Sequence, residues 1–129
     1  MQQATILLAH GSSDPHWLAP FDHLLTNIRQ QLSGDTQWVQ LAYMELAEPS
    51  IEQQVEYLRE LGAQHIHIRP LFFAAGRHLR KDVPAMIDAL QQDLREQGHH
   101  IEIELHSPIG LEPEVASAIT HVVMRQLAQ

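Results

Sequence analysis

Short apolar runs alternate along the chain with stripes of apolar residues at helical spacing. Residues 4–9 are almost continuously apolar and end at His10, which is typical of a buried strand that enters a loop. Further strands are predicted over residues 37–44, 66–73 and 101–105. The last of these alternates with a period of two, as an edge or half-exposed strand does. The pattern therefore predicts four strands.

Each predicted strand is followed by a predicted helix. The first apolar stripe consists of Phe21, Leu24, Leu25, Ile28 and Leu32. We place the start of this helix near Pro20 rather than Pro15, because proline is poorly accommodated inside a helix. A capping box from Ser50 to Gln53 starts the second helix, and the third covers about residues 83–97. The fourth stripe, after Pro113, consists of Val115, Ile119, Val122 and Leu127.

Regular alternation of strands and helices with short connections favours right-handed crossovers and a parallel sheet. We therefore expect a single α/β domain over residues 1–129, with a four-stranded parallel sheet and helices on both faces in three layers. The chain shows no linker, low-complexity tract or convincing internal repeat.

Composition and charge exclude several functional classes. The 129 residues include eight basic and sixteen acidic ones, and the net charge of -8 has the wrong sign for a nucleic-acid-binding protein. No run is long and apolar enough for a membrane span, and the N-terminus does not resemble a signal peptide, so we expect a cytoplasmic protein. There are no cysteines, but there are ten histidines. Any transition-metal chemistry must therefore use imidazole and carboxylate ligands.

The loops after the strands contain the candidate chemical groups, because ligands of open parallel sheets bind at the carboxyl ends of the strands. His10 and His78 follow the first and third strands, each near a glycine, and Glu45 follows the second. His106 ends the fourth strand and is a weaker candidate. Either histidine could instead serve only as a capping or solvated loop residue, and Glu48 is better explained as a turn residue before a proline.

The remaining histidines receive no chemical role from the pattern. His65 and His67 share one strand face and are interpreted as structural or exposed. The others lie on a surface turn or on predicted helices: His16, His23, His99, His100 and His121. No nucleophile elbow, dinucleotide fingerprint or P-loop is present, which disfavours serine hydrolases and nucleotide-binding enzymes.

Three motifs together resemble one family. They are Leu8-Ala9-His10-Gly11-Ser12-Ser13-Asp14-Pro15, Glu45-Leu46-Ala47-Glu48-Pro49-Ser50, and the segment from Pro70 to Pro84 that contains Gly76-Arg77-His78-Leu79-Arg80-Lys81-Asp82. In order and spacing they are similar to the short form of the CbiX-type class II chelatases, the sirohydrochlorin cobaltochelatases and ferrochelatases. Ser13 departs from the pattern, because the family usually has an arginine there.

The resemblance implies a function and roles for individual residues. His10 and His78 match the metal-ligating histidines, and Glu45 matches the acidic residue near the metal. The metal would be Co²⁺, with Fe²⁺ or Ni²⁺ as alternatives, inserted into a tetrapyrrole for cobalamin or siroheme biosynthesis. The resemblance also implies a homodimer and no organic cofactor.

The expected chemistry agrees with these residues. Two neutral imidazoles can hold a divalent metal without the tight grip of thiolates, and a carboxylate or free imidazole can accept a pyrrole proton. The carboxylates of sirohydrochlorin would need local positive charge, for which Arg77, Arg80 and Lys81 are candidates, with Ser12 as a further polar contact. The basic group could also be simply a solvated helix start. Two alternatives stay open: a non-catalytic metal or tetrapyrrole carrier that uses the same histidines, and a phosphoester hydrolase.

Overall fold

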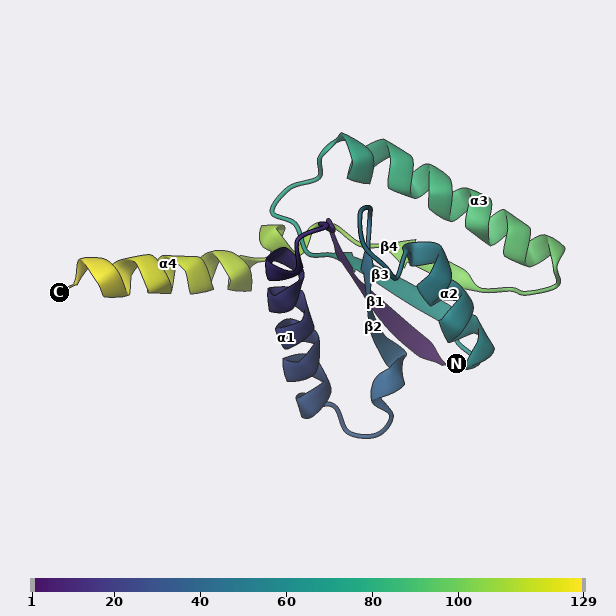
Figure 1. Cartoon of the computed structure of the whole chain (residues 1–129), viewed down its shortest axis with the longest axis horizontal. Helices are drawn as coiled ribbons and strands as arrows, with labels where there is room; N and C mark the ends of the chain where they lie inside the picture. The colour runs from purple at the N-terminus through teal and green to yellow at the C-terminus, as the bar shows by residue number, and fades with distance from the viewer. Residues whose placement is uncertain (1, 129) are drawn as a thin grey trace.

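The computed structural model describes residues 2–128 and contains one parallel sheet (Figure 1). Its strands are β1 (Gln3–Ala9), β2 (Val39–Tyr43), β3 (His65–Pro70) and β4 (Glu102–Leu105). Their order across the sheet is β2-β1-β3-β4, and every pair is parallel. This arrangement confirms the four-stranded parallel sheet predicted from the alternation of elements.

Two strand ends differ from the sequence prediction. β3 ends at Pro70 and not at residue 73. The backbone N–H of Leu71 still donates to the carbonyl of Leu8 at 2.8 Å, but residues 71–73 no longer have strand conformation. β2 begins at Val39, after a 3-10 turn over Thr36–Trp38. Apolar character continues past both true ends, so hydrophobicity alone did not mark them.

Helices cover both faces of the sheet. α1 (Pro15–Gln31) packs on one face, where Phe21 and Leu25 contact a small core over β1 and β2. α2 (Ile51–Glu60) and α3 (Val83–Glu96) cover the other face around the larger core, which includes Ile6, Leu8 and Val55. Burial of these apolar side chains stabilises the layered fold. The prediction of helices on both faces is confirmed.

The start of α1 lies earlier than the sequence analysis placed it. The helix begins at Pro15, the side chain of Asp14 caps it by accepting a hydrogen bond from the backbone N–H of His16 at 2.9 Å, and Pro20 lies inside it. Proline is well suited to the first helical position, and the cap satisfies one free N–H group. These two features outweigh the hydrogen bond that Pro20 cannot donate.

α4 (Pro113–Leu127) projects away from the rest of the chain as a separate arm (Figure 1). It is the helix expected after Pro113, but none of its residues is buried. Ile119 is 42% exposed and Val122 50% exposed, so the predicted apolar stripe faces solvent. Among the described residues, no helix is long and apolar enough to cross a membrane.

Candidate functional site

The loops after β1 and β2 are held against each other at the carboxyl edge of the sheet. Beyond the strand ends, the backbone N–H of Met44 donates to the carbonyl of Ala9 at 2.9 Å, and that of Glu45 donates to the carbonyl of His10 at 3.2 Å. This pairing brings the His10 Nε2 atom to 3.5 Å from Glu45 Oε1. Both side chains are about half exposed, so the pair is open to an incoming ligand.

Gly11 makes this close approach possible. Its φ of +99° lies in the left-handed region, and a Cβ atom built there would lie 1.8 Å from the carbonyl oxygen of Glu45. Only glycine combines this backbone conformation with a carbonyl so near. The glycine after His10 is therefore required by the packing of the two loops.

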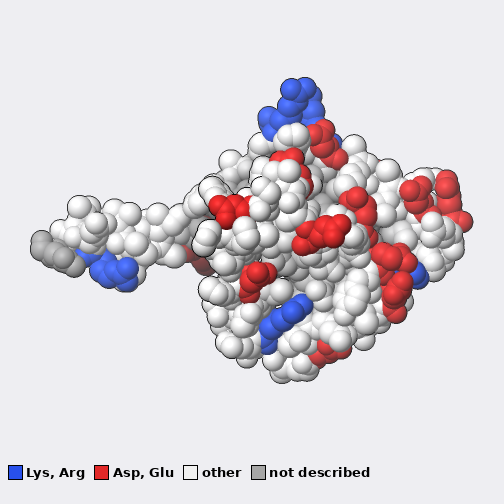
Figure 2. All heavy atoms as spheres, in the orientation of Figure 1, with Lys and Arg blue, Asp and Glu red and all other residues white. Residues whose placement is uncertain are grey.

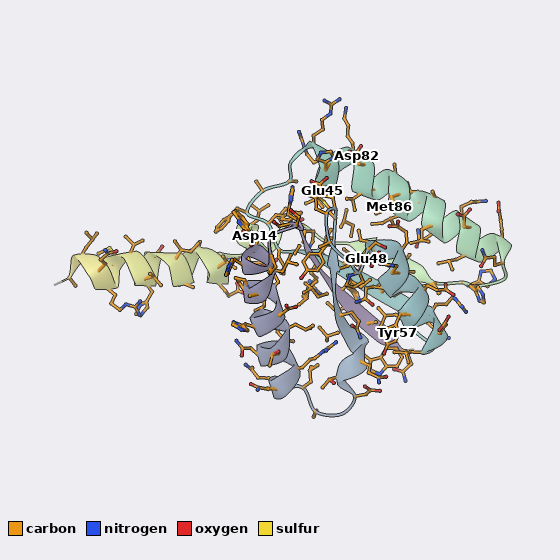
Figure 3. The ribbon with its side chains drawn as sticks, in the orientation of Figure 1. Asp14, Glu45, Glu48, Tyr57, Asp82 and Met86 are labelled. Carbon is orange, nitrogen blue, oxygen red and sulfur yellow. The ribbon has the colours of Figure 1, made fainter. Side chains whose placement is uncertain are left out.

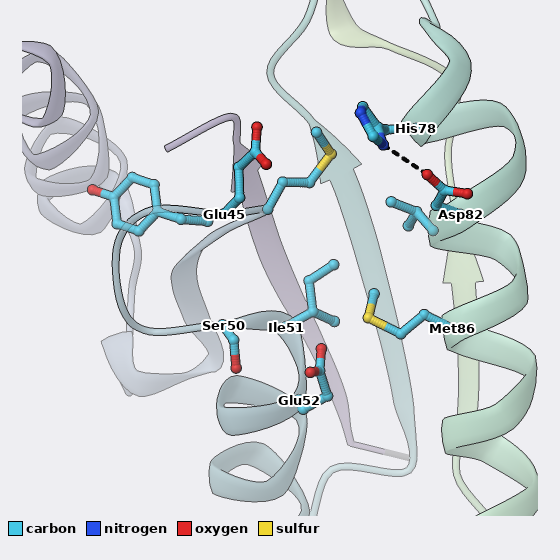
Figure 4. Close-up of a pocket in the computed structure, with 10 residues that line it drawn as sticks. Glu45, Ser50, Ile51, Glu52, His78, Asp82 and Met86 are labelled. Atoms are coloured by element: carbon cyan, nitrogen blue, oxygen red, sulfur yellow. Dashed lines mark hydrogen bonds and ion pairs between the residues drawn. The ribbon is translucent and has the colours of Figure 1, made fainter. Parts of the chain in front are cut away.

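His78 lies in a helical turn and not in the open loop that the sequence predicted. A π-helical turn over His78–Asp82 runs directly into α3, and the backbone N–H of Arg80 donates to Gly76 at 3.0 Å. The turn places His78 Nδ1 2.6 Å from Asp82 Oδ2 (Figure 4). When His78 is neutral, Nδ1–H donates to the carboxylate, and the lone pair of Nε2 is left for a ligand.

His10 and His78 line the same cavity, of about 430 Å³, between the loops after β1 and β3. Its other lining residues are Met44, Leu71, Phe72, Phe73, Ala74, Gly76, Arg77 and Leu79. A second cavity of about 190 Å³ also includes His78, together with the acidic side chains of Glu45, Glu52 and Asp82. Figure 4 shows Glu45 and His78 on opposite sides of this space, and Figure 3 shows Glu45 and Asp82 at the same end of the molecule. His78 therefore lines both cavities, and the second one also contains these three carboxylates.

The predicted basic group is only partly at the site. Arg77, Arg80 and Lys81 are all exposed, but Arg77 alone lines the cavity shared by the two histidines. Figure 2 shows a basic projection where α3 begins, on a face that otherwise carries mostly acidic groups. Ser12 accepts a hydrogen bond from the backbone N–H of Asp14 at 3.0 Å, so its hydroxyl helps to shape the loop.

The tightest cluster of possible metal ligands in residues 2–128 lies elsewhere. The ligand atoms of His65, His67 and Glu104 all lie within 4.8 Å of one another, whereas His10, Glu45 and His78 do not form such a group. Burial and the neighbouring His65 and His106 lower the pKa of His67, which favours its neutral form. Sequence analysis noted that His65 and His67 share a strand face but did not bring them together with Glu104. It also did not single out Asp82, although its spacing of four residues from His78 was a usable signal.

The fold and the site together define an α/β protein in which two histidines and nearby carboxylates surround a partly apolar cavity. Imidazole and carboxylate groups are ligands suited to divalent metals. The chain matches the CbiX family over residues 4–126 and belongs to that family.

Solved structures and relatives agree with this assignment. A CbiX protein from Marinobacter aquaeolei VT8, named for cobalamin (vitamin B12) biosynthesis, is 42% identical with a TM-score of 0.82, over 98% of both chains. The sirohydrochlorin chelatase SirB from Bacillus subtilis subspecies spizizenii, crystallised with cobalt, is 28% identical with a TM-score of 0.79; the match covers 97% of this chain and 51% of SirB. The sirohydrochlorin cobaltochelatase of Saccharolobus solfataricus is 28% identical over 116 residues, 88% of each chain.

Proposed function

We propose that this CbiX-family enzyme, a metal chelatase, inserts a divalent metal ion into sirohydrochlorin, with Co²⁺ as the first candidate. The observation that carries the proposal is that His10 and His78 line one cavity while Glu45 lies 3.5 Å from His10. The relatives named above as sirohydrochlorin chelatases support the substrate. We further propose that residues 1–129 form one chelatase domain, with the cytoplasmic location expected from the sequence.

In this proposal His10 and His78 bind the metal substrate. Asp82 holds the ring of His78 through Nδ1, so that Nε2 is the ligating atom. Imidazoles bind Co²⁺, Fe²⁺ and Ni²⁺ without the hold of a thiolate, so the metal can pass to the macrocycle. The preferred metal then depends on geometry and availability, and the product serves cobalamin or siroheme biosynthesis accordingly.

Insertion releases two protons, because the tetrapyrrole loses two pyrrole N–H hydrogens as it takes up M²⁺. Glu45 is the proposed acceptor of one of them, since its carboxylate lies beside His10 and is open to solvent. The second proton passes to solvent through the exposed mouth of the site. Charge then balances, since the macrocycle exchanges two protons for one divalent ion.

The apolar cavity supports binding of a flat macrocycle with carboxylate substituents. Phe72 and Phe73 provide apolar contact area, and Arg77 is the basic side chain at the rim that can pair with a carboxylate. Arg80, Lys81 and Ser12 stay as secondary candidates for the same contact. The single lining arginine makes Arg77 the preferred one.

We also propose that the chain acts as a homodimer. The site of one chain is open, with His78 about two-thirds exposed, whereas a macrocycle is usually enclosed on both sides. The SirB chain is about twice as long as this one. The exposed stripe of α4 adds an apolar surface that a second copy could cover.

The decisive assay follows sirohydrochlorin absorbance with Co²⁺, Fe²⁺ and Ni²⁺ in parallel. Multiple turnovers with any one metal are expected, and the relative rates rank the metals. Binding of metal or tetrapyrrole without turnover would identify a carrier instead. Activity on generic phosphate esters would indicate a hydrolase.

Three variants test the proposed roles. His10→Ala and His78→Ala should each reduce insertion to background and weaken Co²⁺ binding, and the double variant should lose little more if the two act as a unit. Glu45→Gln should keep most of the metal affinity and slow insertion by about 10²-fold or more, because it removes a general base at similar volume. His99→Ala, on a surface turn, is the matched control and should retain activity. Near-normal insertion in both His→Ala variants would contradict the mechanism.

A further inference from the structure

Half of one sheet face is left uncovered by α1. The core beneath α1 is built on β1 and β2, from Leu7, Ala9, Leu41 and Tyr43. On β3 and β4 the same face carries polar side chains, because His67 is the register partner of both Thr5 and Glu104. His65, two residues before His67, projects from this face as well, and His106 follows Glu104 by two residues, just past the end of β4.

One carboxylate oxygen lies at the centre of three imidazoles on this face. Glu104 Oε2 is 3.4 Å from His65 Nε2, 3.2 Å from His67 Nδ1 and 3.5 Å from His106 Nε2. Nitrogen and oxygen ligands about 2.0–2.1 Å from a tetrahedral zinc ion lie roughly 3.3 Å from one another. The separations of Glu104 Oε2 from His65 and His67 are therefore close to those of a metal ligand set, and the ligand atoms of these three residues all lie within 4.8 Å of one another.

The hydrogen bonds of His67 leave the lone pair of its Nδ1 atom facing the cluster. His67 Nε2 lies 2.8 Å from Gln3 Oε1, which can only accept, so Nε2 carries the hydrogen and Nδ1 presents its lone pair to the cluster. His106 Nε2 lies 2.8 Å from that Nδ1, so Nε2 of His106 carries the hydrogen of this contact and donates it to His67. An ion bound to His67 Nδ1 would replace this hydrogen bond. His65 Nε2 is buried without a hydrogen-bond partner, an arrangement that is unfavourable unless something binds there. A hydrogen bond to the distal nitrogen is the usual support of a metal-bound histidine.

We propose that His65, His67 and Glu104 form a second metal site, which binds a divalent ion of the Zn²⁺, Co²⁺ and Ni²⁺ class. Two imidazoles and one carboxylate suit these borderline ions and not Mg²⁺ or Ca²⁺, which take oxygen ligands. The half-exposed Glu104 leaves a path for the ion from solvent. The inference does not depend on the proposed insertion reaction.

This ion is retained by the protein and is not the one delivered to a macrocycle. None of these three ligands lines either cavity around His10 and His78. The ligands join β3 to β4, the short strand at the edge of the sheet. A bound ion would tie this edge strand to its neighbour and stabilise the folded state, since it binds a site that the unfolded chain lacks.

Calorimetric titration with Zn²⁺ separates the two sites. Wild-type protein should bind two equivalents, and the His10→Ala/His78→Ala double variant should keep one, together with the rise in Tm that Zn²⁺ causes. Adding His67→Ala to that double variant should abolish the remaining Zn²⁺ binding and the rise in Tm. In the same background, Glu104→Gln should weaken Zn²⁺ binding at least 10-fold. This variant preserves the volume of the side chain, so it tests the site even if the histidine variant does not fold. Co²⁺ in place of Zn²⁺ should give the intense visible absorption of a four-coordinate site.

The control is His99→Ala/His100→Ala, which removes two histidines from a surface turn and should leave both equivalents in place. Absence of Zn²⁺ binding in the His10→Ala/His78→Ala variant would overturn the second site and leave the proposed function intact. Binding of two equivalents of Zn²⁺ by that variant would show that His10 and His78 do not bind the metal, and would contradict the proposed function. Unchanged binding and an unchanged Tm shift after His67→Ala or Glu104→Gln would show that the ion lies elsewhere and overturn the assignment.

Discussion

His78 shows how a single neighbour can prepare a ligand. Its ring is exposed and would sample several orientations, but the 2.6 Å contact with Asp82 on the same helical turn selects one orientation and one tautomer. Asp82 is therefore a positioning residue. It acts through His78 and is assigned no contact of its own with the substrate.

Replacing Asp82 with asparagine should weaken the site without removing a ligand. The amide can still accept a hydrogen bond but lacks the charge that supports a metal-bound imidazole, so Co²⁺ affinity and insertion should fall about 10-fold to 100-fold. Calorimetry and the absorbance assay measure the two effects. Asp88→Asn, on the exposed side of α3, removes the same charge and should change neither. Equal effects of both variants would rule out a positioning role.

At the scale of elements, the site depends on the contact between two loops, the one after β1 and the one after β2. Hydrogen bonds beyond the ends of β1 and β2 place His10 beside Glu45, and Gly11 is the position where the two backbones meet. The loops therefore behave as an extension of the sheet.

Gly11→Ala should disrupt this junction. A left-handed backbone with a side chain costs about 1–3 kcal/mol, and the new Cβ would also collide with the carbonyl of Glu45. The matched control is Gly34→Ala, where φ is +95° but no atom lies within 4 Å of the added Cβ. Urea unfolding should show a larger loss of stability for Gly11→Ala, and only that variant should also lose metal insertion. Equal losses would mean that the close approach is unimportant.

At the scale of the whole molecule, α4 projects from the layered fold and has no buried residue. α2 and α3 cover one face of the sheet, whereas the apolar stripe of α4 lies outside the core (Figure 1). Such a surface is unfavourable in water unless another molecule covers it. A second copy fits the dimer proposed above.

Light scattering at micromolar concentration tests the dimer directly. The wild-type protein should have about twice the 14.7 kDa mass of one chain, and Val122→Glu should shift it toward the monomer by placing a charge in the apolar stripe. Gln126→Glu adds the same charge at an exposed polar position of α4 and should remain dimeric. A monomeric wild-type protein would contradict the proposal, and a dimeric Val122→Glu variant would exclude this part of α4 from the interface.

The sequence by itself determined the local features. Periodicity identified the four strands and the four α-helices of residues 2–128, and the carboxyl-edge rule selected His10, Glu45 and His78. These signals depend only on neighbouring residues and on the parallel sheet they imply. It could not determine the strand order, the pairing of Gly11 with Glu45, or the direction of α4. From the sequence we interpreted His65 and His67 as structural or exposed, because their partners Glu104 and His106 are more than 35 residues away in the chain. Only the register of β3 against β4 brings these groups together, and register is a property of tertiary packing.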